Sequence, residues 1–491
     1  MVPAVLVVGL DVTVLSVALP TLARDLGAST DQLQWLSMAY SITYAAAIVP
    51  SGLLGDRAGR RGVLLGSLAV FVAGSLACAL SATAGELIAA RALLGVGAAG
   101  VATLSTAMVN VLFGEAERGR AMTLIMLVNV VGFPLGPILG GWLLGHVAWG
   151  WIFAINVPVA VLGIVAVAWL MPESRASQRP GWDLPGLASL SGAVVALCFG
   201  LTQAESEGWT DASVWPPITL GAVLLAVFLR IERATRDPFV PVGLFRRPRF
   251  AGGAAAAALM SFVIAGLLFV VPQYTQAVLG ASTEVSGLYL LSFAVGMLVA
   301  MPLAQAVSSR FGSGVTIGVG MGLLALSLML AAATTVTTAG WWLVIWAALA
   351  GAAFGLGLPV SMALAIGDVP VDASGVGSGV LQSLRQIATA VGTALLGSLL
   401  GAGYRAGLPT DLPDKIAATA RSGIEQGLAV ANQLGSARLV EQVRAAFVDG
   451  MVHVAYAGAA LSVVSLVAFG IALAIRRART RQQAPEKADV R

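Results

Sequence analysis

The sequence predicts an all-α integral membrane protein with fourteen transmembrane helices and both termini in the cytoplasm. Of its 491 residues, 58% are hydrophobic and 11% are charged, whereas soluble domains carry about 25% charged residues. Apolar runs of about twenty residues, the length that spans a bilayer, recur along the whole chain. Basic residues gather in the turns on one side of the predicted membrane, which fixes the orientation of the helices.

The apolar runs form a group of six, an inserted pair and a second group of six. We expect an N-terminal six-helix bundle at residues 1–171, a linker with two inserted helices at 172–249, a C-terminal bundle at 250–476 and a cytoplasmic tail at 477–491. The predicted spans are, in order, 2–22, 33–53, 62–82, 86–112, 120–145, 150–171, 184–203, 215–231, 250–278, 285–307, 313–334, 340–366, 375–402 and 450–475.

The distribution of Lys and Arg predicts which segments face the cytoplasm. The chain has 28 Lys and Arg residues. Twenty lie in segments on the side of the N-terminus, six lie on the opposite side, and Arg91 and Arg385 fall within spans. Because basic residues favour the cytoplasmic side, both termini are predicted to lie there. The first apolar run begins almost at Met1 without a basic leader, so we expect no secretory signal peptide.

One long loop is predicted on the outer side, at residues 403–449. Its stretch from Ile416 to Val448 is rich in Ala, Gln, Glu and Arg. This composition favours a partly helical surface hairpin or cap, but it fits a flexible linker equally well.

Asp11 lies in the first apolar run, where no other charge occurs. An acid inside a spanning helix is a functional candidate because burying its ionised form is costly. We expect it to take up and release a proton at physiological pH. The alternative is an acid near the membrane end that is solvated or capped.

Two arginines also lie inside predicted spans. Arg91 is a permanent cation and needs a carboxylate or helix carbonyl groups as partners. Arg385 lies in the thirteenth span, about eleven residues from its cytoplasmic end. Its role stays open between pairing with substrate, bridging to a carboxylate and anchoring the structure.

The fifth span carries glycines at four-residue intervals. Gly132, Gly136 and Gly140 share one helix face, so a neighbouring helix can approach very closely. Pro134 and Pro137 remove backbone donors and bend the helix. Such a helix suits a gate, although a glycine-packed helix without a gating role would show the same spacing.

A polar, basic turn follows the second span at Gly52–Arg61. Arg57, Arg60 and Arg61 are predicted to lie in water, since an arginine costs about 2.5–3.5 kcal/mol at the centre of a membrane helix. Asp56 is expected to meet a helix N-terminus or an arginine. A fainter copy, Ser308–Gly312, follows the tenth span. The pair indicates two related halves, or two ordinary helix turns that share Arg-x-Gly.

Four stretches resemble motifs of the major facilitator superfamily. Gly52–Arg61 resembles its motif A, G-x-L-x-D-R-x-G-R-R. The others resemble motifs D (L-D-x-T-x-V-N-V-A-L-P), B (R-x-x-Q-G-x-G-A-A) and C (G-x-x-x-G-P-x-x-G-G) of its fourteen-helix drug:proton antiporters, at Leu10–Pro20, Arg91–Ala99 and Gly132–Gly141. The resemblance covers nearly the whole chain and implies two six-helix bundles around a central cavity.

The sequence departs from these motifs at three positions. Leu15 and Ser16 replace the usual Val and Asn of motif D, and Leu94 replaces the Gln of motif B. The loss of this Gln weakens any hydrogen-bond relay that would extend from Arg91.

The resemblance also implies residue roles and a direction of transport. Asp11 and Arg91 would couple transport to protons, with structural pairing as the alternative for Arg91. Motif C is characteristic of exporters. The residues implied in gating are Asp56, Arg57, Arg60, Arg61, Gly132, Gly136, Pro137, Gly140 and Gly141.

Substrate contacts are expected from the inner helices of both halves. An apolar, aromatic cavity with few acids suits amphipathic or cationic compounds such as drugs or antibiotics. Aromatic residues at helical spacing also arise from ordinary packing. The candidates are Trp35, Tyr40, Asn129, Phe262, Phe269, Gln273, Tyr289, Phe293 and Arg385.

The sequence argues against other classes of activity. It has two histidines far apart, no phosphate-binding loop and no metal-ligand spacing, so we expect neither an enzyme nor a bound cofactor or metal. The proton gradient would supply the energy, and the partners would be small molecules, protons and the lipid of the cell membrane, with no nucleic acid. We expect a single chain to suffice. Export of one metabolite, antibiotic or lipid is the main alternative, and a membrane receptor or scaffold without turnover is a second.

Overall fold

The computed structural model describes residues 2–26, 28, 30–175, 184–206, 209, 211–234, 242–367, 369–370, 374–409, 413–421 and 423–482. Within these residues the regular secondary structure is entirely helical, and every predicted span coincides with helix. Eleven stretches are long and apolar enough to cross a membrane, and α8 contains a shorter apolar stretch, Pro185–Leu201.

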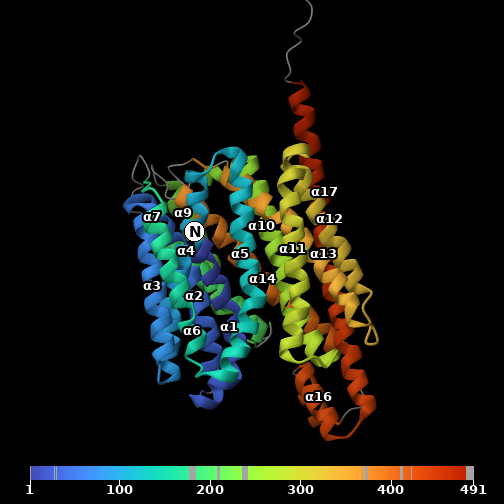
Figure 1. The fold of residues 1–491 in the computed structure, drawn as a ribbon. Helices are drawn as coiled ribbons and strands as arrows, with labels where there is room; N and C mark the ends of the chain where they lie inside the picture. Colours follow the sequence, from blue (N-terminus) through green and yellow to red (C-terminus); the bar gives the residue numbers. More distant parts are fainter. Residues whose placement is uncertain are drawn as a thin grey trace, which may run out of the picture.

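The N-terminal bundle packs around α1 and α4. α5 and α7 pack against α1, while α2 and α3 pack against α4 (Figure 1). The predicted sixth span is divided at Ile155 into two helices. The helices are α1 (Val2–Asp25), α2 (Thr30–Ala58), α3 (Arg60–Leu80), α4 (Ala84–Leu112), α5 (Glu115–His146), α6 (Trp151–Ala154) and α7 (Asn156–Leu170).

The inserted pair consists of α8 (Leu184–Ser206) and α9 (Trp215–Ala234). The two helices pack against each other, and α8 also contacts α2 and α14. The pair therefore lies beside the junction of the two bundles, and α8 is the helix that contacts both of them.

The C-terminal bundle packs mainly around α13 and α14. α13 packs against α11, α12 and α10, and α14 packs against α10 and α17. The elements are η1 (Val242–Arg246), α10 (Pro248–Gln273), a π-helical turn η2 (Tyr274–Val278), α11 (Thr283–Phe311), α12 (Ser313–Ala332), α13 (Gly340–Gly367), α14 (Ser374–Gly407) and α17 (Ala437–Gln482).

The loop predicted at 403–449 contains a helical hairpin. α15 (Asp414–Arg421) and α16 (Ile424–Gln433) lie at one end of the molecule, opposite the end at which α17 extends past the other helices (Figure 1). The Tyr404 hydroxyl donates to the carbonyl oxygens of Ala420 and Gly423, and Arg444 Nε donates to the carbonyl of Ala277. These contacts favour the hairpin over the flexible linker.

The two bundles meet along helices from both halves. α2 and α4 of the first bundle pack against α14, and α5 packs against α11 and α13. Gly52 of α2 lies against Gly375 of α14, and a Cβ atom at Gly379 would lie 3.3 Å from the Cα atom of Val49. Small residues thus allow α2 and α14 to approach closely.

The basic turn is shorter than the sequence suggested. α2 continues through Asp56 to Ala58, and Gly59 alone, with a φ of 118°, separates it from α3. Gly312, with a φ of 88°, separates α11 from α12 in the same way. Both positions need glycine because side chains are strained at such φ values. The two halves therefore repeat this one-residue break.

Candidate functional site

Asp11 and Arg91 form an ion pair inside the N-terminal bundle. Arg91 Nη1 lies 2.6 Å from Asp11 Oδ2, with Asp11 fully buried and the Arg91 side chain 3% exposed. Asn156 Nδ2 donates to Asp11 Oδ1 at 3.2 Å. This single site therefore joins α1, α4 and α7, and it excludes the solvated-acid alternative for Asp11.

Arg91 has further partners on α2. Its Nε donates to the carbonyl of Leu36 at 3.4 Å, and its guanidinium carbon lies 4.6 Å from the centre of the Tyr40 ring. A cation over an aromatic face is stabilised by the ring quadrupole. Arg91 thus keeps favourable contacts when the charge of Asp11 is neutralised.

The glycine-rich face of α5 packs against the segment of α1 that carries Asp11. A Cβ atom at Gly132 would lie 2.9 Å from the carbonyl carbon of Gly9, and one at Gly140 would lie 2.9 Å from a methyl group of Val14. Gly136, between them, is buried. The expected close approach is confirmed, and it positions the backbone on both sides of Asp11.

Asp56 lies at a second ion pair, at the Gly59 break. Arg60 donates to Asp56 Oδ1 from Nε at 2.9 Å and from Nη2 at 2.7 Å, and both side chains are fully buried. The expectation that Arg60 lies in water is wrong. Burial is possible because the carboxylate neutralises the guanidinium and Ser174 Oγ accepts from Nη1 at 2.8 Å.

The Asp56 carboxylate also reaches the other bundle. The backbone N–H groups of Gly375 and Val376, in the first turn of α14, donate to Oδ1 and Oδ2 at 2.9 Å each. A helix N-terminus presents unpaired N–H groups and a positive dipole, which favour a carboxylate. Asp56 therefore meets both expected partners, an arginine and a helix N-terminus.

The start of α3 receives a second carboxylate from the segment after α7. Glu173 accepts from the backbone N–H groups of Arg61 and Gly62 at 3.2 Å each. Arg61 donates through Nη2 to the carbonyl of Ala168, and both Arg57 and Arg61 are half-buried. The arginines of this break are thus ordered by protein contacts rather than fully solvated.

Arg385 projects from α14 among neutral partners. Its Nη1 donates to Gln382 Oε1 at 2.9 Å and lies 3.6 Å from Met362 Sδ, and its Nε donates to Ser261 Oγ at 3.2 Å. Tyr44 of α2 interacts with it electrostatically across the junction of the bundles. The polar contacts of Arg385 thus lie within the second bundle, and Tyr44 of the first bundle is near enough to interact with its charge.

The remaining cavity candidates are distributed over several contacts. Trp35 is 46% exposed and stacks on Phe199 of α8, with ring centres 6.1 Å apart. Tyr40 is buried under Arg91. In the second half the aromatic candidates contact neighbouring helices of their own bundle, and Gln273 bonds within its own helix. Glycines of neighbouring helices lie against three of them: Gly392 against the Phe262 backbone, Gly397 against the Phe269 ring and Gly340 against the Tyr289 hydroxyl. The Phe293 ring pairs with the Phe354 ring. Gln273 donates a hydrogen bond to the carbonyl of Phe269.

Three predicted site residues lie outside the described side chains. Asn129, Pro137 and Gly141 belong to helix α5, and the structure describes their backbone as helical without describing their side chains. Their predicted roles stay predictions.

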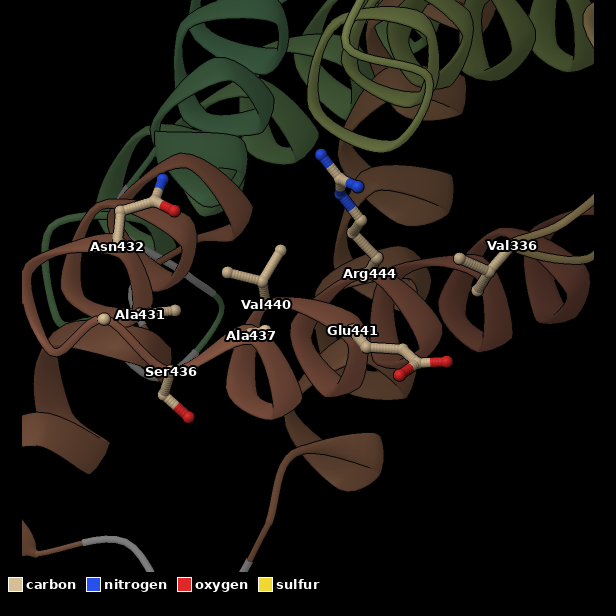
Figure 2. A pocket seen from close by; sticks show the side chains of 9 residues that line it. Val336, Ala431, Asn432, Ser436, Ala437, Val440, Glu441 and Arg444 are labelled. Atoms are coloured by element: carbon tan, nitrogen blue, oxygen red, sulfur yellow. The ribbon is translucent and has the colours of Figure 1, made fainter.

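A cavity of about 630 Å³ lies away from these pairs, in the hairpin region (Figure 2). Val336, from the segment between α12 and α13, and residues around the start of α17 line it. Glu441 and Arg444 are its charged members. It is open at the surface and belongs to the hairpin side of the C-terminal bundle.

Sequence reasoning missed several partners of the predicted residues. In the sequence these partners are marked only by their polarity, in or beside apolar runs. They are Asn156, Tyr44, Ser261, Gln382 and Glu173. Which distant residue each would contact depends on packing between helices.

Comparisons with known proteins agree with this architecture. The family model of the Major Facilitator Superfamily matches residues 1–393. The tetracenomycin C resistance and export protein of Streptomyces glaucescens is 32% identical over 510 residues, covering 98% of this chain and 92% of that protein. The multidrug resistance protein Stp of Mycobacterium tuberculosis is 31% identical over 377 residues, covering 76% of this chain and 70% of that protein. The crystal structure of the human organic anion transporter TETRAN matches with a TM-score of 0.65 at 17% identity, over 95% of this chain and 97% of that chain, which shows a shared fold.

Proposed function

The chain belongs to the Major Facilitator Superfamily, and we propose that it is a fourteen-helix, proton-coupled exporter of amphipathic small molecules such as drugs or antibiotics. Both termini lie in the cytoplasm, and the protein works in the cell membrane. The relatives named for tetracenomycin C resistance and export and for multidrug resistance support this class of substrate.

The buried Asp11–Arg91 pair is the observation that carries the proposal. A carboxylate in a membrane interior is costly, and here it is held by one arginine and one amide. Protonation of Asp11 removes the charge attraction, while Arg91 retains Leu36 and the Tyr40 ring. Asp11 can therefore change its protonation without leaving an isolated cation.

The Asp56 contacts supply the conformational part of the mechanism. They join α2 to the first turn of α14, so they exist when the bundles are closed together at that end. We assign this end to the cytoplasm, where the closed contact seals the cavity from inside. The contact then breaks as the bundles rock to open inward, which is alternating access. Inward-moving protons and outward-moving substrate favour different arrangements of the bundles.

Proton movement in reconstituted vesicles tests this function. A pH gradient is imposed, amphipathic antibiotics and dyes are added, and wild type is compared with Asp11→Asn. Asp25→Asn is the matched control, because Asp25 is an exposed acid at the end of the same helix. We expect substrate-induced proton release in wild type and the control and none in Asp11→Asn.

Release that persists in Asp11→Asn would place the proton site elsewhere. If no compound moves protons through wild type, proton-coupled export is contradicted and a receptor or scaffold becomes the better account.

A dedicated exporter of one antibiotic is the second candidate. The relative that aligns with 98% of this chain is named for resistance to a single compound. A substrate panel separates the two: a dedicated exporter responds to one structural class, and a multidrug exporter responds to several.

A further inference from the structure

The second bundle carries a half-buried positive charge, Arg385, on a helix without acidic residues. By sequence, α10, α12, α13 and α14 contain no Asp or Glu. Arg385 nevertheless lies eleven residues after Ser374, the first residue of α14, about 16 Å along the helix. A permanent cation at this depth requires a compensating partner.

The two arginines that the structure buries fully each have a carboxylate partner. Arg91 is paired with Asp11, and Arg60 is paired with Asp56. Around Arg385, the described part of the chain provides a hydroxyl, an amide oxygen and a thioether, and none of its acids forms an ion pair with this guanidinium. Among the described side chains, the two buried arginines, Arg60 and Arg91, are each neutralised by a carboxylate, whereas the half-buried Arg385 forms no ion pair.

Arg385 lies near the junction between the bundles. Along the antiparallel contact of α14 with α2, Gly375 lies at Gly52 and Gly379 lies at Val49. Continuing this register brings Arg385 to the level of Tyr44, in agreement with their electrostatic interaction. Arg385 thus lies at the level of Tyr44 and close enough for its charge to act on that side chain.

Tyr44 stacks on a second tyrosine, Tyr40, inside the first bundle. Tyr40 and Tyr44 stack with ring centres 6.0 Å apart and planes at 18°. The Tyr40 side chain is buried, at 5% exposure, and its hydroxyl has no hydrogen-bond partner among the residues that the structure describes. A buried hydroxyl without a protein partner is uncommon and leaves a polar group available to a ligand.

We propose that Arg385 is the anion-binding residue of the substrate site, and that the substrate carries an acidic group, a carboxylate or an ionised phenol. This inference rests on the proposed transport function and narrows its substrate class. The acidic group pairs with Arg385, and an aromatic body lies along Tyr44 and Tyr40. A cationic substrate, the class expected from the aromatic cavity alone, would add a second positive charge where the first has no counter-ion.

Binding of three pyrene probes tests the charge preference without requiring transport. Pyrenebutyrate, pyrenebutanol and pyrenemethylamine share one apolar body and are anionic, neutral and cationic at neutral pH. Affinities for the full-length purified protein in lipid nanodiscs follow from quenching of tryptophan fluorescence. For wild type we expect pyrenebutyrate to bind most tightly and pyrenemethylamine most weakly.

Variants then assign the preference to Arg385. Removing one partner of a buried charge pair commonly costs about 2 kcal/mol or more, so we expect at least a roughly thirtyfold loss of pyrenebutyrate affinity in Arg385→Gln. Arg385→Lys should retain part of that affinity, and pyrenebutanol should bind all three proteins alike. Arg444→Gln, which removes a cation of the distant hairpin, is the matched control and should behave as wild type.

Three results would overturn the proposal: no pyrenebutyrate binding to wild type, tightest binding of pyrenemethylamine, or a parallel loss of the acid and the alcohol in Arg385→Gln. The wild-type ranking remains decisive if Arg385→Gln fails to fold. Replacing chloride by gluconate in the buffer distinguishes the sources of anion. A site for any small anion gains pyrenebutyrate affinity when chloride is removed, whereas a site for aromatic acids does not.

The outcome is separable from that of the export proposal. Tight, Arg385-dependent binding of pyrenebutyrate together with absent proton release would retain the anion site and contradict coupled export. Proton release driven by cationic dyes, without preference for the acid, would do the reverse.

Discussion

Two buried Asp–Arg pairs hold different parts of this molecule together. Asp11 and Arg91 are 80 residues apart and join helices of one bundle. Asp56 and Arg60 are four residues apart in the sequence. Asp56 also accepts two backbone hydrogen bonds from the first turn of α14, in the other bundle. A pair within one bundle can respond to a proton, whereas a carboxylate shared between bundles responds to their relative movement.

The largest expected effect comes from breaking the intra-bundle pair on one side. Arg91→Gln leaves the Asp11 carboxylate buried without its cation, which costs about 3–5 kcal/mol in comparable pairs. We expect a marked fall in the melting temperature of the purified protein. The double variant Asp11→Asn/Arg91→Gln removes both charges and should recover most of that loss, yet remain unable to couple protons.

Equal melting temperatures for wild type and Arg91→Gln would show that the pair does not stabilise the bundle. Recovery of proton release in the double variant would show that Asp11 is not the coupling site.

Asp56→Asn is the next largest change. It weakens two charge-assisted hydrogen bonds to α14, each worth about 1.5–3 kcal/mol, so the balance between closed and open arrangements should shift by more than tenfold. Accessibility of a cysteine introduced near Gly375 to a water-soluble maleimide reports the opening. Arg310→Gln, an exposed change at the corresponding break of the second half, is the control and should leave the labelling rate at the wild-type value. Unchanged labelling in Asp56→Asn would contradict the latch.

Gly132→Ala should act on Asp11 through α1. The added Cβ atom would lie 2.9 Å from the Gly9 carbonyl carbon, so α1 and α5 must separate, at a typical overpacking cost of about 1–3 kcal/mol. We expect a lower melting temperature and reduced substrate-induced proton release. Gly145→Ala lies on the same helix with open space around it and should match wild type. If both alanine variants behave alike, the glycine contact does not position Asp11.

The smallest effect is expected from restoring symmetry. Ser309→Asp supplies the second half with the acid that the first half has in Asp56. Ser309 is exposed, so the new carboxylate stays solvated. We therefore expect the free energy of unfolding to change by no more than about 0.5 kcal/mol. Labelling at the Asp56 end should stay unchanged as well. A strong stabilisation would show that the two breaks are equivalent after all.

The sequence was sufficient for the local features and insufficient for the pairings. The apolar runs predicted every helix that carries a site residue, and the glycine spacing predicted that α5 packs closely against a neighbour. Neither feature says that the neighbour is the Asp11 segment of α1. Asp11 and Arg91 were each expected to need a partner, but helices that are far apart in sequence become adjacent only through the fold.

Arg60 shows where reasoning from single residues failed. The high cost of inserting an arginine into hydrocarbon predicts that Arg60 lies in water, but that cost applies to an unpaired charge. Asp56, one helical turn away, neutralises the Arg60 guanidinium inside the protein. Ser174, which follows the last helix of the first bundle, accepts a hydrogen bond from it. Arg385 remained open for the related reason that its neighbours come from α10, α13 and α2.

A distance measurement between the bundles tests the contrast between the two pairs most directly. Spin labels are attached at Ala58→Cys and Arg310→Cys, two exposed positions at the Gly59 and Gly312 breaks, after the buried Cys78 and Cys198 are replaced. Double electron–electron resonance then gives the distance distribution as a function of pH. We predict a pH-dependent distribution in wild type, a pH-independent one in Asp11→Asn, and one shifted to longer distances at every pH in Asp56→Asn. Superimposable distributions for Asp56→Asn and wild type, or a full pH response in Asp11→Asn, would contradict the account.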